Sequence, residues 1–153
     1  AKSEPPVALT NAEKSALQDY VTTIGCAGIN YLVSSATSDK LYVQADVYYQ
    51  GQYSAIIADN VITAIEAFLA ALPFDGQLLV SDLERTIRTT TGVKDVVLKN
   101  VKARANGTLL ASASSLVASN ALVSRSWNTV AGYIVAETTP SNTLADTLTF
   151  IPQ

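Results

Sequence analysis

Residues 40–72 read KLYVQADVYYQGQYSAIIADNVITAIEAFLAAL, and two hydrophobic periods follow each other in this stretch. Between Leu41 and Tyr49 every second residue is apolar or aromatic, which predicts a strand with one apolar face. Between Ile57 and Leu72 apolar residues recur every three or four positions, which predicts a helix with one apolar stripe. The stripe consists of Ile57, Val61, Ile65, Phe68 and Leu72. Its burial would contribute on the order of 8–15 kcal/mol before chain entropy is subtracted, so we expect this stretch to anchor the core.

A helix and a strand are predicted before this stretch. Thr10 and Glu13 have the spacing of a capping box, in which each side chain accepts a hydrogen bond from the other residue's backbone N–H. One side of the helix carries Leu17, Tyr20, Val21 and Ile24. Gly25 suits its C-terminal end. Residues 29–35 have strand composition, and the turn residues 37–39 predict a hairpin with the strand that follows.

A helix and a second long strand are predicted after this stretch. Residues 81–84, Ser-Asp-Leu-Glu, have the pattern of a second capping box, and the helix that they begin would end near Gly92. Residues 93–104 are predicted to form a strand, although its apolar residues change face partway along. Val96 and Leu98 share one parity, whereas Val101 and Ala103 share the other. A β-bulge near Lys99–Asn100 would place all four on one face.

The remaining chain predicts a long excursion and two closing strands. Residues 106–120 are rich in Ala and Ser, and we expect a projecting loop within an excursion over 106–128. Residues 133–137 and 147–151 are predicted as strands. The element order predicts a single α+β domain over 1–153. Its expected form is a two-layer sandwich with helices on one face of a mixed or antiparallel sheet.

The composition favours an assembly component. The chain has 153 residues, of which 48% are hydrophobic and only 15% charged, and a poorly charged surface is easily buried against a neighbour. A monomer with a Ser/Thr/Asn-rich surface is the alternative. The ten basic residues are spread along a chain of net charge −3, so we expect no nucleic-acid partner. We also expect no membrane span, because every apolar run is far shorter than roughly 20 residues.

The usual catalytic groups are missing from the sequence. It contains no histidine, the commonest general base and metal ligand, and no glycine-rich phosphate loop. Cys26 has no histidine to activate it, and we expect it to be buried or inert. Asp82 and Glu84 are explained by helix capping, and Asp59 and Glu66 should lie on a solvated helix side. We therefore expect no enzyme, no catalytic or metal-binding residue and no cofactor.

Two groups of residues are candidates for a protein interface. The polar face of the strand in 40–50 carries Tyr42, Gln44, Asp46 and Tyr48, and tyrosine is enriched at interfaces. Alternatively, these side chains lie under helices or under the excursion. Arg125 and Trp127 are of the residue types that dominate binding energy at interfaces. Alternatively, Trp127 plugs the edge of the core. The candidate interface residues are Tyr42, Gln44, Tyr48, Arg125 and Trp127.

Four segments together resemble a known family. They are residues 43–49, residues 64–74 with Ala-Ile-Glu-Ala-Phe-Leu leading to Leu-Pro-Phe, residues 78–83, and residues 91–96 with Thr-Gly-Val-Lys-Asp-Val. The pattern is similar to the C-terminal domain of baseplate J-like proteins, which are wedge components of contractile phage tails and related injection systems. The similarity covers about residues 9–104, and the rest of the chain lies outside it. Family members are usually longer and this chain contains no Met, so we expect a C-terminal fragment of a longer protein.

The resemblance implies a mechanical role. It implies a structural subunit of a virion tail baseplate, assembled in the bacterial host cytoplasm and bound to other wedge proteins in a large hetero-oligomer. Such subunits pack around the tail hub and pass a conformational change from receptor-binding fibres to the sheath. The alternative is a small-ligand-binding or regulatory α+β module, which would need a closed and mostly apolar pocket with a few polar groups.

Overall fold

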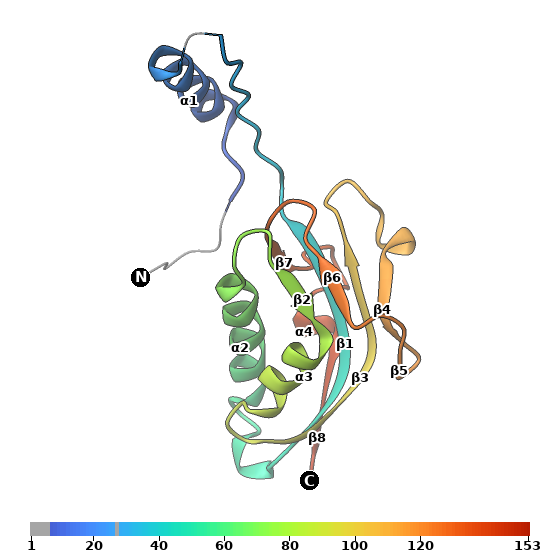
Figure 1. The fold of residues 1–153 in the computed structure, drawn as a ribbon. Helices are drawn as coiled ribbons and strands as arrows, with labels where there is room; N and C mark the ends of the chain where they lie inside the picture. The colour runs from blue at the N-terminus through green and yellow to red at the C-terminus, as the bar shows by residue number, and fades with distance from the viewer. Residues whose placement is uncertain (1–6, 27) are drawn as a thin grey trace.

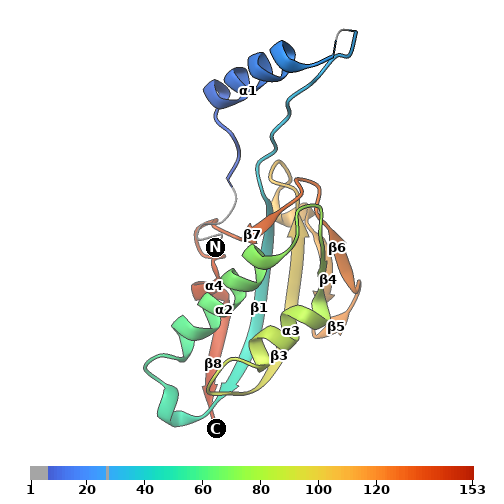
Figure 2. The ribbon, with the colours of Figure 1, turned by 60° about the vertical axis from the view of Figure 1, so that its left-hand side comes forward.

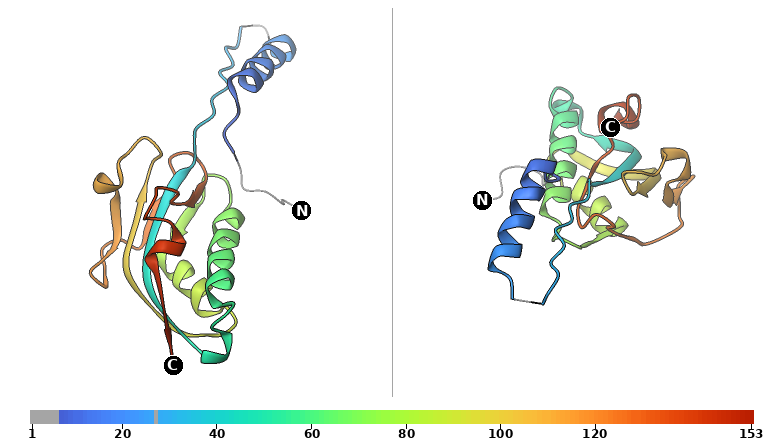
Figure 3. Two further views of the ribbon diagram at one scale, coloured as in Figure 1. Left: turned by 180° about the vertical axis from the view of Figure 1, so that it is seen from behind. Right: turned by 90° about the horizontal axis from the view of Figure 1, so that it is seen from above.

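The computed structural model describes residues 7–26 and 28–153, and these fall into two regions (Figure 1). Residues 39–153 form a body of two layers. Residues 7–26 and 28–38 form an arm that projects from one end of the body. The arm is one helix and an extended segment that returns to the body (Figures 1 and 3).

A mixed six-stranded sheet forms one layer of the body. Its strands are β1 (Asp39–Tyr49), β3 (Val93–Arg104), β4 (Ser114–Ala118), β5 (Ala121–Leu122), β7 (Ile134–Ala136) and β8 (Leu148–Pro152). The order is β5-β4-β3-β1-β7, with β1 antiparallel to β3. On its other edge β1 pairs in parallel with β7 near its start and with β8 near its end. The sheet is therefore mixed, with β1 at its centre.

The second layer covers one face of this sheet (Figure 2). It contains α2 (Ile57–Ala71), α3 (Val80–Arg88) and a ribbon of β2 (Gln77–Leu79) paired with β6 (Ser126–Asn128). Three short helical turns complete the body: η1 (Gly51–Tyr53) between β1 and α2, η2 (Leu110–Ser112) between β3 and β4, and α4 (Leu144–Thr147) between β7 and β8. Helices on one face of a mixed sheet confirm the predicted α+β architecture.

Burial in the core follows the two predicted periods. The buried apolar face of β1 consists of Leu41, Val43, Ala45, Val47 and Tyr49. The buried stripe of α2 consists of Ile57, Val61, Ile65 and Leu69. Phe68 and Leu72, which we predicted in this stripe, are only partly buried at its edge. The anchoring role of residues 40–72 is thus confirmed. Leu69, rather than Phe68, is the buried member of the stripe in the last turn of α2.

The predicted bulge in β3 is present. Gln44 pairs with Asn100 and Ala45 pairs with Leu98, so Lys99 is the extra residue in the ladder. Because of this insertion, apolar residues of opposite parity on the two sides of the bulge are buried on the same face. These residues are Val96, Leu98, Val101 and Ala103.

The predicted hairpin before β1 is wrong. Residues 29–38 form no strand and lie extended in the arm beside α1 (Asn11–Ile24). The side chain of Gln18 donates a hydrogen bond to the carbonyl of Tyr31 (2.7 Å) and accepts one from the N–H of Val33 (2.8 Å). These bonds from a helix side chain hold the segment against α1, at the place where a strand partner was expected.

Two further predictions differ from the structure. α3 begins at Val80 after Leu79, and no side chain caps it, so residues 81–84 are not a capping box. Residues 106–120 are not a projecting loop throughout, because 114–118 form β4 at the side of β3. Leu116 and Val117 are buried there, and the burial of these two side chains outweighs the weak strand signal of the serines around them.

Candidate protein-binding surfaces

The arm exposes most of its large apolar side chains. Among the described residues, the chain has 14 exposed large hydrophobic side chains, and eight of them lie in residues 7–38. These are Val7, Leu9, Leu17, Tyr20, Ile24, Ile29, Tyr31 and Leu32. The predicted apolar side of α1 therefore exists, but no residue of α1 is buried. The arm carries an apolar surface that its own chain leaves uncovered.

Polar contacts, rather than a core, hold the arm together. The predicted capping box is present: the N–H of Thr10 donates to the Glu13 carboxylate (2.8 Å), and the Thr10 hydroxyl accepts from the N–H of Glu13 (3.3 Å). The backbone and then the side-chain hydrogen bonds from Thr10 lower the pKa of Glu13. At the other end of α1, a Cβ on Gly25 would lie 2.2 Å from the ring of Tyr31. Glycine therefore permits the return segment to pass this close to the helix.

The arm is attached to the body through Asp39, a fully buried carboxylate at the start of β1. Asp39 accepts hydrogen bonds from the indole N–H of Trp127 (3.0 Å) and from the N–H groups of Val130 (2.7 Å) and Ala131 (3.2 Å). The hydroxyl of Tyr133 donates to the carbonyl of Ala36 (3.1 Å). Burial of a carboxylate costs free energy unless its oxygens accept hydrogen bonds. The bonds to Asp39 therefore fix the position at which the chain passes from the arm into the body.

An apolar groove runs along the body between α2, β7 and α4. Its volume is about 1010 Å³. Its apolar lining includes Ile62, Leu69, Leu72, Pro73, Ile134 and Val135. Its lining also includes polar groups, namely Glu66 from α2 and Glu137 and Thr138 after β7. The start of β7 pairs with the start of β1, so the groove begins at the same end of the body as the arm.

Glu137 at the groove is locked in an ion pair. The side chain of Arg104 donates to both of its carboxylate oxygens, at 2.8 Å and 2.9 Å, and the N–H and hydroxyl of Thr139 donate as well. Burial alone would raise the pKa of Glu137, but the hydrogen bonds from Arg104, Thr139 and Thr138 outweigh it and lower the pKa from 4.5 to about 2. Glu137 is therefore a structural anchor, with its oxygens engaged within the body.

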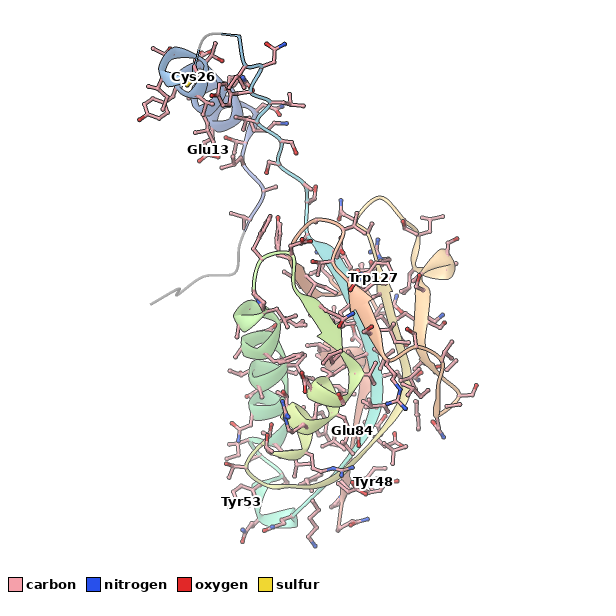
Figure 4. The ribbon with its side chains drawn as sticks, viewed as in Figure 1. Glu13, Cys26, Tyr48, Tyr53, Glu84 and Trp127 are labelled. Carbon is pink, nitrogen blue, oxygen red and sulfur yellow. The ribbon has the colours of Figure 1, made fainter. Side chains whose placement is uncertain are left out.

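The tyrosine row of β1 lies on the sheet face opposite α2 and α3. Tyr42, Gln44 and Tyr48 alternate with the buried core residues of β1, and each is partly exposed. Tyr48 is labelled in Figure 4. Gln44 accepts a hydrogen bond from the side chain of Asn100 (2.6 Å). The predicted row therefore lies on the sheet face away from α2 and α3, where its tyrosines and Gln44 are half-buried and Asp46 is buried in an ion pair with Lys99.

Arg125 and Trp127 belong to a different surface. Trp127 lies in β6 opposite Leu78 of β2, is partly buried and packs against the core (Figure 4). Arg125 is exposed just before this strand. Because β6 lies in the helical layer, the five candidate interface residues do not form one surface.

The acidic side chains and the thiol are scattered. Within 7–26 and 28–153, no group of three His, Cys, Asp or Glu residues is placed to hold a metal ion. Asp82 and Glu84 pair with arginines of α3 at 2.9 Å and 2.8 Å. Cys26 is exposed in the arm rather than buried. The helices of these described residues include none long and apolar enough to cross a membrane.

Comparison with protein-family models and with curated proteins identifies no relative. No protein-family model matches the chain, and no curated protein matches it significantly. The similarity to baseplate J-like proteins therefore stays a prediction made from residues 9–104. The arm and the groove were both missed by sequence reasoning. The signal for the arm was present in the apolar side of residues 17–24, which we expected a core to cover.

Proposed function

We propose that this chain is a structural subunit that works through protein contacts, of the kind found in the baseplate wedge of a contractile tail or a related injection system. The type of assembly follows from the resemblance in residues 43–96. On this proposal the partners are other baseplate proteins and the subunit is located in the tail baseplate.

The exposed apolar surface of the arm is the observation that supports this function most. Exposed aliphatic and aromatic side chains gathered on one projecting element are typical of a contact with another protein. Leu32, which is 89% exposed, and Ile24, which is 62% exposed, would both leave water in such a contact. The half-buried tyrosines of β1 offer a second surface for protein contacts, on the sheet face opposite α2 and α3.

A small-ligand module is the second candidate, and the groove supports it. A volume of about 1010 Å³ with a mostly apolar lining is close to the range of small-molecule sites, although this groove is partly open to solvent. Native mass spectrometry of the protein from its natural source would distinguish the two. A bound small molecule of constant mass favours the ligand module, and an unliganded chain in a large particle favours the structural subunit.

The direct test is fractionation of the native source. Lysate particles are separated by sedimentation, and peptides of this chain are quantified by mass spectrometry in each fraction. We expect the chain in the particle fractions, at a constant copy number relative to the other tail proteins. Recovery only as a free monomer, with no chain in the tail particles, would overturn the proposal.

Replacing Tyr42 and Tyr48 together by Ser tests the sheet face, when the variant is expressed in the native source and its particles are fractionated in the same way. We expect lower incorporation into particles, because the half-buried rings would be lost from a contact. Leu109→Ser is the matched control, since Leu109 is 77% exposed but lies outside both proposed surfaces. Equal incorporation of both variants would remove the tyrosine row from the proposal.

A further inference from the structure

We propose that α1 of one copy binds in the groove of a second copy, so that the chain assembles head to tail through its arm. The inference rests on the proposed assembly function and names a partner for it, a second copy of this chain. The arm supplies an apolar helix with no cover, and the groove supplies an apolar site open to solvent, both within the same described residues. A helix laid into an apolar groove is a recurrent mode of recognition.

The two surfaces match in length. The apolar side of α1 from Leu17 to Ile24 spans about 10 Å at 1.5 Å per residue. The groove follows α2 from Ile62 to Leu72, which is about 15 Å on the same measure. Two turns of α1 therefore fit alongside three turns of α2.

The charges at the edges of the two surfaces are complementary. Lys14 precedes Leu17 by three positions, so it lies at the end of the apolar side of α1. It is the one basic residue in 7–26 and 28–38. Glu66 lines the groove, is exposed and has no ion pair within the described chain, whereas Glu137 is already paired with Arg104. A helix seated in the groove can therefore place Lys14 beside Glu66.

The arm of the same copy leaves its own groove open. α1 lies beyond the end of the body in the side views, and the main contacts between the described elements do not involve it (Figure 2 and Figure 3, left). Arm and groove are different surfaces, so the contact is heterologous and either closes into a ring or continues as a filament.

The first test is the self-association constant of the full chain, measured by analytical ultracentrifugation over a concentration series. We expect concentration-dependent oligomers. Replacing Leu17 and Ile24 by Ser should weaken association roughly a hundredfold, because two apolar anchors are lost. Ala67→Trp, which puts a large side chain at the groove, should weaken association through the other surface. Leu109→Ser is the control and should leave it unchanged. A chain that stays monomeric at the highest soluble concentration overturns the proposal.

Charge reversal tests the register of the contact. Lys14→Glu and Glu66→Lys should each weaken association by up to about fivefold, as expected for a pair at the rim of an interface. The two reversals in one chain should restore most of the loss. Losses in the double variant that simply add would contradict the proposed pairing of Lys14 with Glu66.

Cross-linking from Cys26, the only cysteine in the chain, identifies the occupied surface. The thiol is labelled with a photoactivatable cross-linker, and ¹⁴N and ¹⁵N copies are mixed before illumination. We expect cross-linked peptides of mixed isotope that join Cys26 to 62–73 or 134–145. Cross-links only within one copy, or to another surface, overturn the proposal. Particle fractionation is independent of this result, because a subunit can join a tail through other proteins without binding its own copy.

Discussion

The arm and the body contain similar apolar helices that have opposite surroundings. In α2, Ile65 is fully buried between the sheet and its neighbours, whereas in α1, Ile24 is 62% exposed. Both helices have an apolar side with the same three-to-four spacing. The spacing therefore predicts a helix with an apolar binding face, but it does not determine whether the surface that covers this face belongs to the same chain. In the arm, capping and the Gln18 bonds replace the core as the source of order.

Paired substitutions, one in the body and one in the arm, test whether the two regions are stabilised independently. The largest expected effect is at Glu137, which is 3% exposed. Glu137→Gln leaves the Arg104 guanidinium buried without its counter-charge, so we expect a loss of about 3–5 kcal/mol in the free energy of unfolding at pH 7. Urea denaturation measures it. The arm counterpart is Glu13→Gln, which should not change the unfolding of the body measurably, since Glu13 is exposed. Equal losses in the two variants would contradict the division into arm and body.

The next effect concerns two isoleucines. Ile65→Ala removes a fully buried side chain from the core and should cost about 2–5 kcal/mol of unfolding free energy. Ile24→Ala should change the stability of the dilute monomer by less than about 0.5 kcal/mol, because its side chain is largely in water. Thermal and urea denaturation at low protein concentration provide the measurement. A large loss for Ile24→Ala in the monomer would show that α1 packs on its own body in solution.

Acid should destabilise the body through Glu137. Its pKa is lowered to about 2 in the folded chain, so its contribution is complete above the ordinary value of 4.5 and is lost as the pH falls from 4.5 through 2. The shift corresponds to about 3 kcal/mol. The free energy of unfolding, measured by denaturant titration at each pH, should fall by that amount more in the unmodified chain than in Glu137→Gln. Parallel pH curves for the two proteins would be incompatible with the lowered pKa.

A smaller effect is expected at two glycines with positive φ. Gly92 has φ +95°, and a Cβ there would lie 2.7 Å from the ring of Tyr53, so Gly92→Ala should cost about 1–3 kcal/mol. Gly28 in the arm has φ +86° with open space around it. Gly28→Ala should leave the unfolding transition of the body in place, although it strains the turn locally. Calorimetry compares the two transitions. Similar shifts of the midpoint in both variants would count against an independent arm.

The smallest expected effects come from substitutions at two capping boxes. Thr143→Ala removes the box that begins α4 beside the sheet and should cost about 1 kcal/mol of unfolding free energy. Thr10→Ala removes the same box from α1 and should lower only the helix content, measured by far-ultraviolet circular dichroism. A change in helix content without a change in the urea midpoint is the expected result for Thr10→Ala. A lower midpoint would show that the capping of α1 supports the body.

The sequence alone predicted features that depend on neighbouring residues. The strand and helix in residues 40–72 follow from hydrophobic period, and the bulge at Lys99 follows from the change of parity within 93–104. The box at Thr10 is a contact over three residues, so its spacing was sufficient. The second expected box, at 81–84, failed because α3 begins at Val80, two residues before the start that a cap at Ser81 implies, and the side chain of Val80 is buried.

Only the tertiary structure decided which surfaces meet. The parallel pairing of β7 and β8 with β1, the strand at 114–118 and the bond between Arg104 and Glu137 all join residues far apart in the chain. The apolar side of α1 is the clearest example, since its sequence is compatible with either a core or a surface. Local patterns specify the shape of an element and its apolar side. What covers that side depends on long-range packing. The hydrophobic effect is non-directional, so any apolar neighbour that excludes water can cover it.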